Sequence, residues 1–246
     1  MNTASPFRPQ SGCFPSSWYC VSMQLTDYRQ VWELQKELVA ARKDKAIDAD
    51  TVLILEHPAV FTFGRRGGIE NLTVSQTFLE KAGIGLIQVE RGGSITFHGP
   101  GQVVVYLIMD IQAAGLSVTG YVTRLEEIML RTAADWGIAA RRHPLNRGIW
   151  VDLKKMGSVG IAVRHGITFH GLALNVNLPL DPFGWIHPCG LKGIQVTSLA
   201  KESKQNVSMS KVQKSLKRHI ESVFSVRLEA IELPALQGRL CRTATA

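Results

Sequence analysis

Cys189 lies in a stretch of sequence whose side chains could carry out nucleophilic chemistry. It stands between a proline and a glycine, and the segment from Asp152 to Gly190 also contains four candidate cations, Lys154, Lys155, Arg164 and His170. A cysteine thiolate attacks a thioester well and also leaves well, but a thiol is mostly protonated at neutral pH unless a cation lies beside it. We therefore predict that Cys189 accepts an acyl group and that one of the two adjacent lysines is its partner.

Two other roles for this cysteine have to be weighed. An internal cysteine is often only a small buried hydrophobic residue, although Pro188 and Gly190 place this one in a loop, where functional residues are common. A hydrolase would pair Cys189 with His170 and Asn175, whereas an acyltransferase would pair it with a lysine. A transferase must exclude water, and the apolar, glycine-containing stretches at 160–163 and 171–174 suit its walls, so we favour the transferase.

A glycine-rich segment, Arg91–Gln102, is the second candidate for function. Four glycines and a proline in this segment predict a loop rather than a regular element. The loop opens into Val103–Ile111, whose unbroken apolar sequence is typical of a central strand buried on both faces. Glycines let backbone N–H groups approach a ligand closely. The alternative is a wide surface hairpin, which would not require the polar Arg91, Thr96 and His98.

These candidates have to be positioned by a framework of alternating strands and helices. Apolar periodicity predicts helices at 28–42, 75–83, 119–136 and 212–223, and strands at 51–55, 60–63, 84–89, 103–111, 149–153, 159–163 and 167–176. Residues 154–158, which begin with the two lysines, are predicted to be a turn. The alternation predicts an α/β (α+β) fold, in which helices pack against a mixed β-sheet. We predict a disordered tail over 1–22, one catalytic domain over 23–233 and a flexible tail over 234–246.

Composition limits the classes of protein that fit. The 246 residues carry a net charge of +8, and 45% of them are hydrophobic, which is typical of a soluble globular domain. No apolar run reaches the roughly 20 residues that span a bilayer. The four cysteines include no Cys-x-x-Cys pair, so we expect no metal site and a reducing, cytoplasmic environment. Basic runs are short and no nucleic-acid motif is present, which leaves two interpretations of the basic surface: a solvated surface without a partner, or a surface that binds an acidic protein.

Several blocks of sequence, in order, resemble the lipoyl(octanoyl) transferases, which belong to the biotin and lipoate protein ligase superfamily. The blocks are Glu56–Gly64 (EHPAVFTFG), Arg91–Tyr106 (RGGSITFHGPGQVVVY), Lys155–Asn177 (KMGSVGIAVRHGITFHGLALNVN) and Pro188–Gly190 (PCG). Together they cover most of the chain, and the resemblance implies the catalytic-domain fold of that superfamily. Two positions depart from the family pattern, since Gly157 stands where a larger residue is common and Phe97 where tyrosine is common.

The resemblance also implies an activity and a set of site residues. In the family, a cysteine takes an octanoyl group from acyl carrier protein as a thioester and passes it to a lysine of a lipoyl domain. By this resemblance the catalytic residues are Cys189 and Lys155, supported by His170. The residues that the resemblance assigns to substrate binding are Arg91, Gly92, Gly93, Ser94, Ile95, Thr96, Phe97, His98, Ser158, Val159, Gly160, Gly171, Leu172 and Ala173.

Partners and cofactors follow from the same resemblance. The acyl donor is acyl carrier protein, which carries the acyl group on its phosphopantetheine, and no other cofactor is expected. The acceptors are the lipoyl domains of 2-oxoacid dehydrogenases and the glycine cleavage H protein. We expect a monomer that binds neither nucleic acid nor membrane. The main alternative is an ATP-dependent lipoate or biotin protein ligase, because Gly64–Gly68 (GRRGG) superficially resembles the glycine-arginine loop of such enzymes, although a ligase needs no cysteine.

Overall fold

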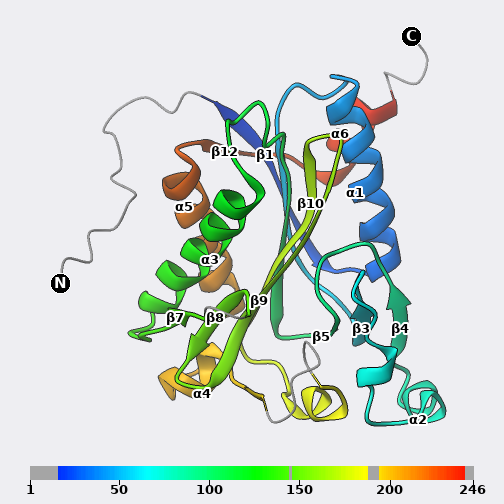
Figure 1. Cartoon of the computed structure of the whole chain (residues 1–246). Helices are drawn as coiled ribbons and strands as arrows, with labels where there is room; N and C mark the ends of the chain where they lie inside the picture. The colour runs from blue at the N-terminus through cyan, green and yellow to red at the C-terminus, as the bar shows by residue number, and fades with distance from the viewer. Residues whose placement is uncertain (1–15, 144–145, 188–193, 242–246) are drawn as a thin grey trace.

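A large mixed sheet forms the centre of the molecule (Figure 1). The computed structural model describes residues 16–143, 146–187 and 194–241. The order of the sheet is β12-β1-β2-β6-β10-β9-β8-β7, and β11 pairs with β9 outside this path. The strands are β1 (Ser17–Leu25), β2 (Thr51–Glu56), β6 (Gln102–Ile108), β7 (Arg141–Arg142), β8 (Gly148–Val151), β9 (Lys154–Arg164), β10 (Ile167–Asn175), β11 (Gln195–Val196) and β12 (Arg227–Ala230).

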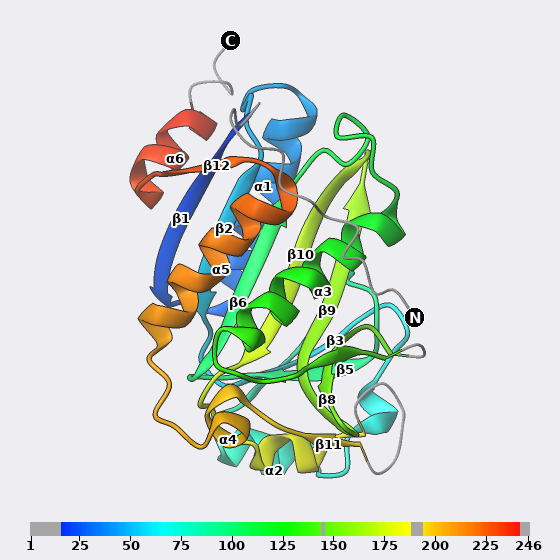
Figure 2. The same ribbon diagram turned by 90° about the vertical axis from the view of Figure 1, so that its left-hand side faces the viewer.

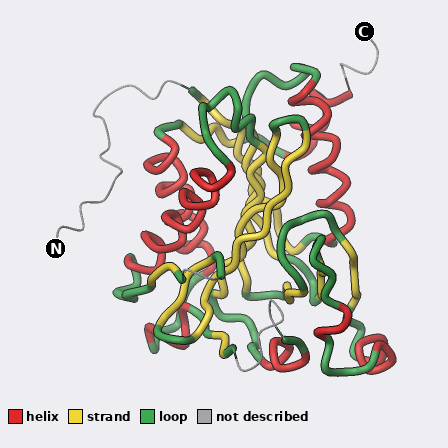
Figure 3. Tube along the Cα trace, in the orientation of Figure 1, coloured by secondary structure: helices red, strands yellow, loops and turns green. Residues whose placement is uncertain are grey.

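Helices cover both faces of this sheet. On one face lie α3 (Val118–Ala134) and α5 (Met209–Phe224), and on the other lie α1 (Tyr28–Lys43) and α6 (Leu233–Cys241). Figure 2 shows α3 and α5 crossing in front of the strands, and Figure 3 shows the sheet between the two helical layers. Strand β6 contributes Val103 and Val105 to one core and Val104 and Tyr106 to the other, because side chains alternate across a strand. The predicted fold class is confirmed, as is a central strand buried on both faces.

A smaller sheet lies beside the end of α1 (Figure 1). It has the order β4-β3-β5, with β3 (Val60–Phe63), β4 (Gly85–Gln88) and β5 (Ile95–His98). The short helices α2 (Gln76–Lys81) and α4 (Leu199–Ser203) and the 3-10 turns η1 (Ile69–Asn71) and η2 (Asp181–Trp185) complete the described elements. Ser75, the first residue of the helix predicted over 75–83, caps α2 by accepting a hydrogen bond from the Phe78 N–H.

Four details of the sequence prediction are wrong. Residues 17–22 belong to β1, which pairs with β2 and β12, so order begins before residue 23. Residues 233–241 form α6 and bury Leu236 rather than extending as a tail. The glycine-rich segment contains β5, whose pairing with β3 is a long-range contact that local composition does not reveal. The turn before β9 lies at residues 152–153, so Lys154 and Lys155 are strand residues.

Candidate active site

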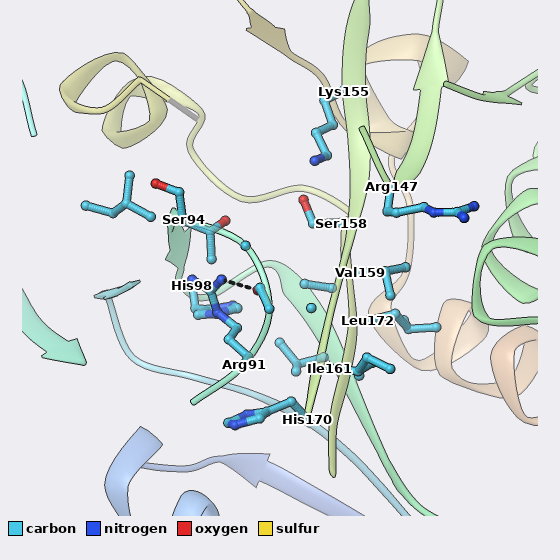
Figure 4. A pocket seen from close by; sticks show the side chains of 18 of the residues that line it. Arg91, Ser94, His98, Arg147, Lys155, Ser158, Val159, Ile161, His170 and Leu172 are labelled. Atoms are coloured by element: carbon cyan, nitrogen blue, oxygen red, sulfur yellow. Dashed lines mark hydrogen bonds between the residues drawn. The ribbon is translucent and has the colours of Figure 1, made fainter. Parts of the chain in front are cut away.

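A cavity of about 580 Å³ opens between the large sheet and the glycine-rich segment. Its walls come from β9, β10 and residues 91–98, and Figure 4 shows Lys155 toward one end and His170 toward the other, with Ser158, Val159 and Ile161 between them. On β9 the distance from Lys155 to Ile161, which pairs with His170, is about 20 Å at the rise of a strand. The cavity is therefore elongated, and polar residues lie at both of its ends.

Nearly all of the predicted site residues that the structure describes line this cavity. They are Lys155, His170, the whole of 91–98 apart from Phe97, and the segments 158–160 and 171–173. Phe97 instead lies behind the wall, where its ring packs 5.1 Å from Phe61 and 5.7 Å from Phe183. The structure thus brings together three segments that are far apart in sequence, while their role in binding substrate remains a prediction.

Lys155 is a buried cation at one end of the cavity. Its side chain is 6% exposed, its ammonium donates a hydrogen bond of 2.7 Å to the Asn146 side-chain oxygen, and Nζ lies 5.5 Å from the centre of the Trp150 ring. The Asn146 backbone oxygen accepts a hydrogen bond from Trp150 Nε1 at 3.3 Å. The amide oxygen of Asn146 orients the ammonium without adding a negative charge, so the lysine can act on neighbouring groups as a cation or a proton donor.

The loop that carries Asn146 is anchored by a fully buried carboxylate on α3. Glu126 Oε1 accepts a hydrogen bond of 2.9 Å from the Gly148 N–H, and Glu126 Oε2 lies 3.4 Å from Arg142 Nε and 3.6 Å from an Arg147 guanidinium nitrogen. Gly148 has a φ of 126°, and a Cβ there would collide with the Gly157 carbonyl oxygen. This packing holds β8 against β9 and fixes the loop beside Lys155.

The two adjacent lysines point to different surroundings, because successive side chains of a strand face opposite sides of the sheet. Lys154 forms an ion pair of 2.7 Å with Glu202 of α4 and does not line the cavity. Lys155 lines the cavity and contacts Asn146. Of these two, Lys155 alone is positioned to take part in chemistry inside the cavity.

Cys189 itself lies outside the described residues, but the described chain is anchored on either side of it, and on the C-terminal side it is anchored to Lys155. Before it, the His187 N–H donates to the Asn71 carbonyl oxygen at 2.7 Å. After it, Val196 pairs with Lys155 in the β11–β9 ladder and lines the cavity, and the Thr197 N–H donates to the Lys155 carbonyl oxygen at 2.9 Å. The chain therefore returns to Lys155 only a few residues after Cys189.

Arg91 ties the glycine-rich segment to both sheets. Its guanidinium donates to the Thr62 carbonyl oxygen at 2.6 Å and to the Thr62 hydroxyl at 2.9 Å, and the neighbouring Gly92 N–H donates to the Ile161 carbonyl oxygen of β9 at 2.8 Å. Gly160 of β9 packs against Arg91, since a Cβ at this position would lie 3.0 Å from Arg91 Cδ. Arg91 therefore has a clear structural role in positioning this wall of the cavity.

Near His170 the cavity wall is polar and deeply buried, with His98 and Tyr106 lining it and the His57 ring packed against both without lining the cavity itself. His57 contacts the Thr26 carbonyl oxygen at 2.7 Å and the Tyr106 hydroxyl at 2.8 Å, and His98 Nδ1 contacts Gln102 Oε1 at 2.7 Å. Burial lowers the pKa of His57 to about 4 and that of His98 to about 3. Both rings are therefore neutral at physiological pH and serve as hydrogen-bonding groups.

The alternative of a Cys–His–Asn hydrolase is not supported by these positions. His170 and Asn175 are five residues apart on β10, which is about 16 Å at the rise of a strand. Asn175 accepts a hydrogen bond from Gln102 Nε2 at 2.9 Å and donates one to the Thr197 carbonyl oxygen at 2.9 Å. It therefore braces β6 and β11 rather than orienting the His170 imidazole.

Sequence reasoning missed several residues of this site. Asn146 and Glu126 carry no local signal, because an asparagine in a loop and a glutamate on a helix are ordinary residues. Tyr28 and Tyr106 were assigned to apolar elements, although both line the cavity. Gly157, a departure from the family pattern, faces Met129 of α3, since a Cβ there would lie 2.7 Å from the Met129 sulfur.

Comparison with known proteins identifies the family. The model of the lipoyl protein ligase A/B catalytic domain matches residues 27–221. The chain belongs to this family. It is 43% identical over 208 residues to an octanoyltransferase of Desulfotalea psychrophila, covering 84% of this chain and 93% of that protein. It is 41% identical over 222 residues to an octanoyltransferase of Syntrophobacter fumaroxidans, covering 90% and 97% of the two chains.

Solved structures of lipoate protein ligases share the fold at lower sequence identity. A lipoate-protein ligase A bound with ATP superposes with a TM-score of 0.73 and 18% identity, covering 92% of this chain and 93% of that one. A putative lipoate protein ligase from T. acidophilum with bound lipoic acid gives a TM-score of 0.69 and 17% identity, covering 92% and 94%. These likenesses support the predicted ligase-like catalytic domain as a fold.

Two further findings concern the described residues as a whole. No helix among them is long and apolar enough to cross a membrane. In the same ranges, no three or more His, Cys, Asp or Glu side chains gather in a way that could hold a metal ion.

Proposed function

We propose that this protein is an octanoyltransferase, which moves an octanoyl or lipoyl group from acyl carrier protein, through a thioester on Cys189, to a lysine of a lipoyl domain. The observation that carries the proposal is the buried Lys155 ammonium, which contacts an amide oxygen at one end of an elongated cavity. The curated relatives named octanoyltransferase, at 43% and 41% identity, support the same activity.

The first half of the reaction is a thioester exchange. The Lys155 ammonium favours the thiolate form of Cys189, and this thiolate attacks the carbonyl carbon of the donor thioester. A new carbon–sulfur bond forms, and the bond to the pantetheine sulfur breaks. The departing thiolate takes a proton from Lys155, which is left as a neutral amine.

The second half makes an amide. The amine of the acceptor lysine attacks the thioester on Cys189, and the now neutral Lys155 accepts the proton that this amine loses. The carbon–sulfur bond breaks, Cys189 leaves as the thiolate, and Lys155 is again an ammonium. Because the donor is already an activated thioester, the sequence of steps needs neither a nucleotide nor another cofactor.

The charge around the cavity supports acidic protein partners. Arg66 and Arg147 both line the cavity, and the whole chain carries a net charge of +8. Acyl carrier protein would be attracted to such a surface, which raises the rate of association more than the affinity. The acceptors would be lipoyl domains of 2-oxoacid dehydrogenases and the glycine cleavage H protein, with the enzyme acting as a monomer in the cytoplasm.

The test is the intact mass of the protein after incubation with octanoyl-acyl carrier protein in the absence of ATP. We expect one octanoyl adduct that hydroxylamine removes. Cys189→Ser should lose the hydroxylamine-sensitive adduct and the transfer to a lipoyl domain, because a hydroxyl is far less nucleophilic than a thiolate. Cys20→Ala is the matched control, since Cys20 lies buried in β1 away from the cavity. A thioester adduct that persists in Cys189→Ser would contradict the assignment.

The same assay separates the transferase from the ATP-dependent ligase. The ligase structures share 18% and 17% identity with this chain, which supports the fold alone. With ATP, magnesium and free octanoate as the only acyl source, we expect no modified lipoyl domain. Efficient transfer under these conditions would place the protein among the ligases.

A further inference from the structure

His170 has a backbone conformation that is unusual for its place in the fold. It lies within β10 and pairs with Ile161 of β9, yet its φ is 58°, in the left-handed region that favours glycine. Its N–H donates to the side chain of Gln35 on α1 at 2.7 Å. Such a strained backbone persists only where the surroundings impose it, and it is often found at functional sites.

His170 lines the cavity, and its ring nitrogens have no hydrogen-bonding partner among the described residues. The side chain is 1% exposed and lines the cavity, at the opposite end from Lys155 (Figure 4). Both Nδ1 and Nε2 lack a hydrogen bond, and the nearest carboxylate oxygen, of Glu90, lies 3.9 Å from Nε2, too far for one. His57 and His98, by contrast, have partners at both ring nitrogens.

The ring is a neutral donor and acceptor rather than a cation. Burial, and then the positive charge of Arg91, lower the pKa of His170 to about 3. A neutral imidazole offers one N–H donor and one nitrogen acceptor. A buried polar group without a partner is costly, so a ligand that supplies one gains more than a ligand that covers it with a methyl group.

We propose that His170 is a specificity-determining residue at the floor of the acyl cavity, where it hydrogen-bonds to a heteroatom near the far end of the acyl chain. The inference rests on the proposed function, in which the thioester lies near Lys155 and the acyl chain runs along β9 toward His170. Medium-length chains that carry a hydroxyl or thiol at the far end are therefore preferred over alkyl chains of the same size. Plain alkyl chains that reach the floor are disfavoured, which limits their length.

The test compares pairs of free acids of equal size, 8-hydroxyoctanoate with nonanoate and 10-hydroxydecanoate with undecanoate. Isothermal calorimetry gives the affinity ratio of hydroxy acid to alkyl acid in each pair, and no turnover is required. In the wild-type protein at least one pair should favour the hydroxy acid. In His170→Leu that ratio should fall by about tenfold, because the hydrogen bond is lost and an apolar floor replaces it.

Two control variants distinguish loss of the His170 hydrogen bond from a general disruption of the fold. His165→Leu is a matched variant, since His165 also has a positive φ, of 53°, but is exposed in the β9–β10 turn, so its ratio should equal that of the wild type. His170→Asn tolerates a left-handed backbone and keeps a hydrogen-bonding side chain, so it serves if the leucine variant fails to fold, and its ratio should stay above one.

Equal affinities within both pairs in the wild type, or ratios that His170→Leu leaves unchanged, would overturn the proposal. Transfer of octanoyl from acyl carrier protein is measured separately on the same samples. If the wild type shows no octanoyl transfer, the proposed function is wrong. If it shows transfer but the affinity ratios are unchanged in His170→Leu, only the proposed role of His170 is wrong.

Discussion

The two ends of the cavity are built in different ways. At one end, Lys155 is held by a loop, through Asn146, and the loop is held by Glu126 of α3. At the other end, His170 has a strained backbone within β10 and its N–H donates to Gln35, while its ring has no hydrogen-bonding partner among the described residues. Both residues lie on strands of the large sheet, but the Lys155 ammonium is oriented by the side chain of a loop residue, whereas the His170 ring is left open to a ligand.

This difference predicts which measurements each end should affect. Changes at the Lys155 end should alter the rate of acyl transfer and its pH dependence. Changes at the His170 end should alter the choice of acyl chain and the stability of the fold in acid.

Lys155→Met should give the largest loss. Methionine keeps much of the volume of the side chain but removes the charge and the proton, so acyl transfer should fall by at least about 100-fold. Iodoacetamide should also alkylate the Cys189 thiol more slowly at neutral pH, because a neighbouring cation favours the thiolate. Both are measured on protein whose unfolding transition matches the wild type. Wild-type alkylation kinetics in Lys155→Met would show that this lysine does not act on the cysteine.

The His170 end should make the fold sensitive to acid. In the unfolded chain a histidine has a pKa near 6.5, whereas the folded His170 has a pKa of about 3 because of burial and Arg91. Between these values the unfolded chain binds more protons, so stability falls as pH falls, by about 1.4 kcal/mol per pH unit. His170 alone should thus lower the free energy of unfolding by about 2 kcal/mol when the pH falls from 6.5 to 5.

Urea unfolding of the wild type and His170→Leu at pH 7 and pH 5 measures this effect. The loss of stability between the two pH values should be about 2 kcal/mol smaller in the variant. His57 and His98, whose pKa values are also lowered by burial, should keep part of the acid sensitivity in both proteins. His165→Leu, at an exposed position, should behave as the wild type. An unchanged pH dependence in His170→Leu would show that its imidazole is not held neutral.

Asn146→Ala should have a smaller effect on rate. Without the amide oxygen the Lys155 ammonium loses one fixed partner, so we expect kcat to fall about tenfold while KM changes little, since orientation rather than binding is lost. Asn146→Asp supplies the more specific readout. A carboxylate beside the ammonium favours its charged form, so the basic limb of the pH–rate profile should move to higher pH. If neither variant alters this limb, Asn146 has only a structural role.

The sequence was sufficient for the parts of the fold that depend on local periodicity. The apolar run of Val103–Ile111 identified the central strand, and the periodic stripe of 119–136 identified α3. Prediction from the sequence failed for β5, which depends on pairing with β3, and for β1 and α6, which are ordered by contacts with distant elements. Local composition does not indicate contacts between segments that are distant in the sequence.

Some residues of the candidate site could be predicted from the sequence and others could not. Resemblance to a family located Lys155 and the lining segments, because those residues form contiguous motifs in the sequence. The Asn146–Glu126 support and the strained backbone of His170 were not predictable, since the first depends on the folding of a loop and the second on a φ angle. The motifs therefore mark where chemistry occurs, while the groups that tune it arise from the tertiary structure.

Lys154→Met should give the smallest effect and is the sharpest control for the Lys155 end. Lys154 differs from Lys155 by one position on β9, yet its ammonium pairs with Glu202 at 2.7 Å, with side chains that are 30% and 16% exposed. A pair that is partly open to water contributes little, so stability should change by no more than about 0.5 kcal/mol. Because Lys154 does not line the cavity, transfer rate and Cys189 alkylation should match the wild type. If Lys154→Met slows alkylation as much as Lys155→Met does, the effect is one of general surface charge, and the distinction between the two lysines fails.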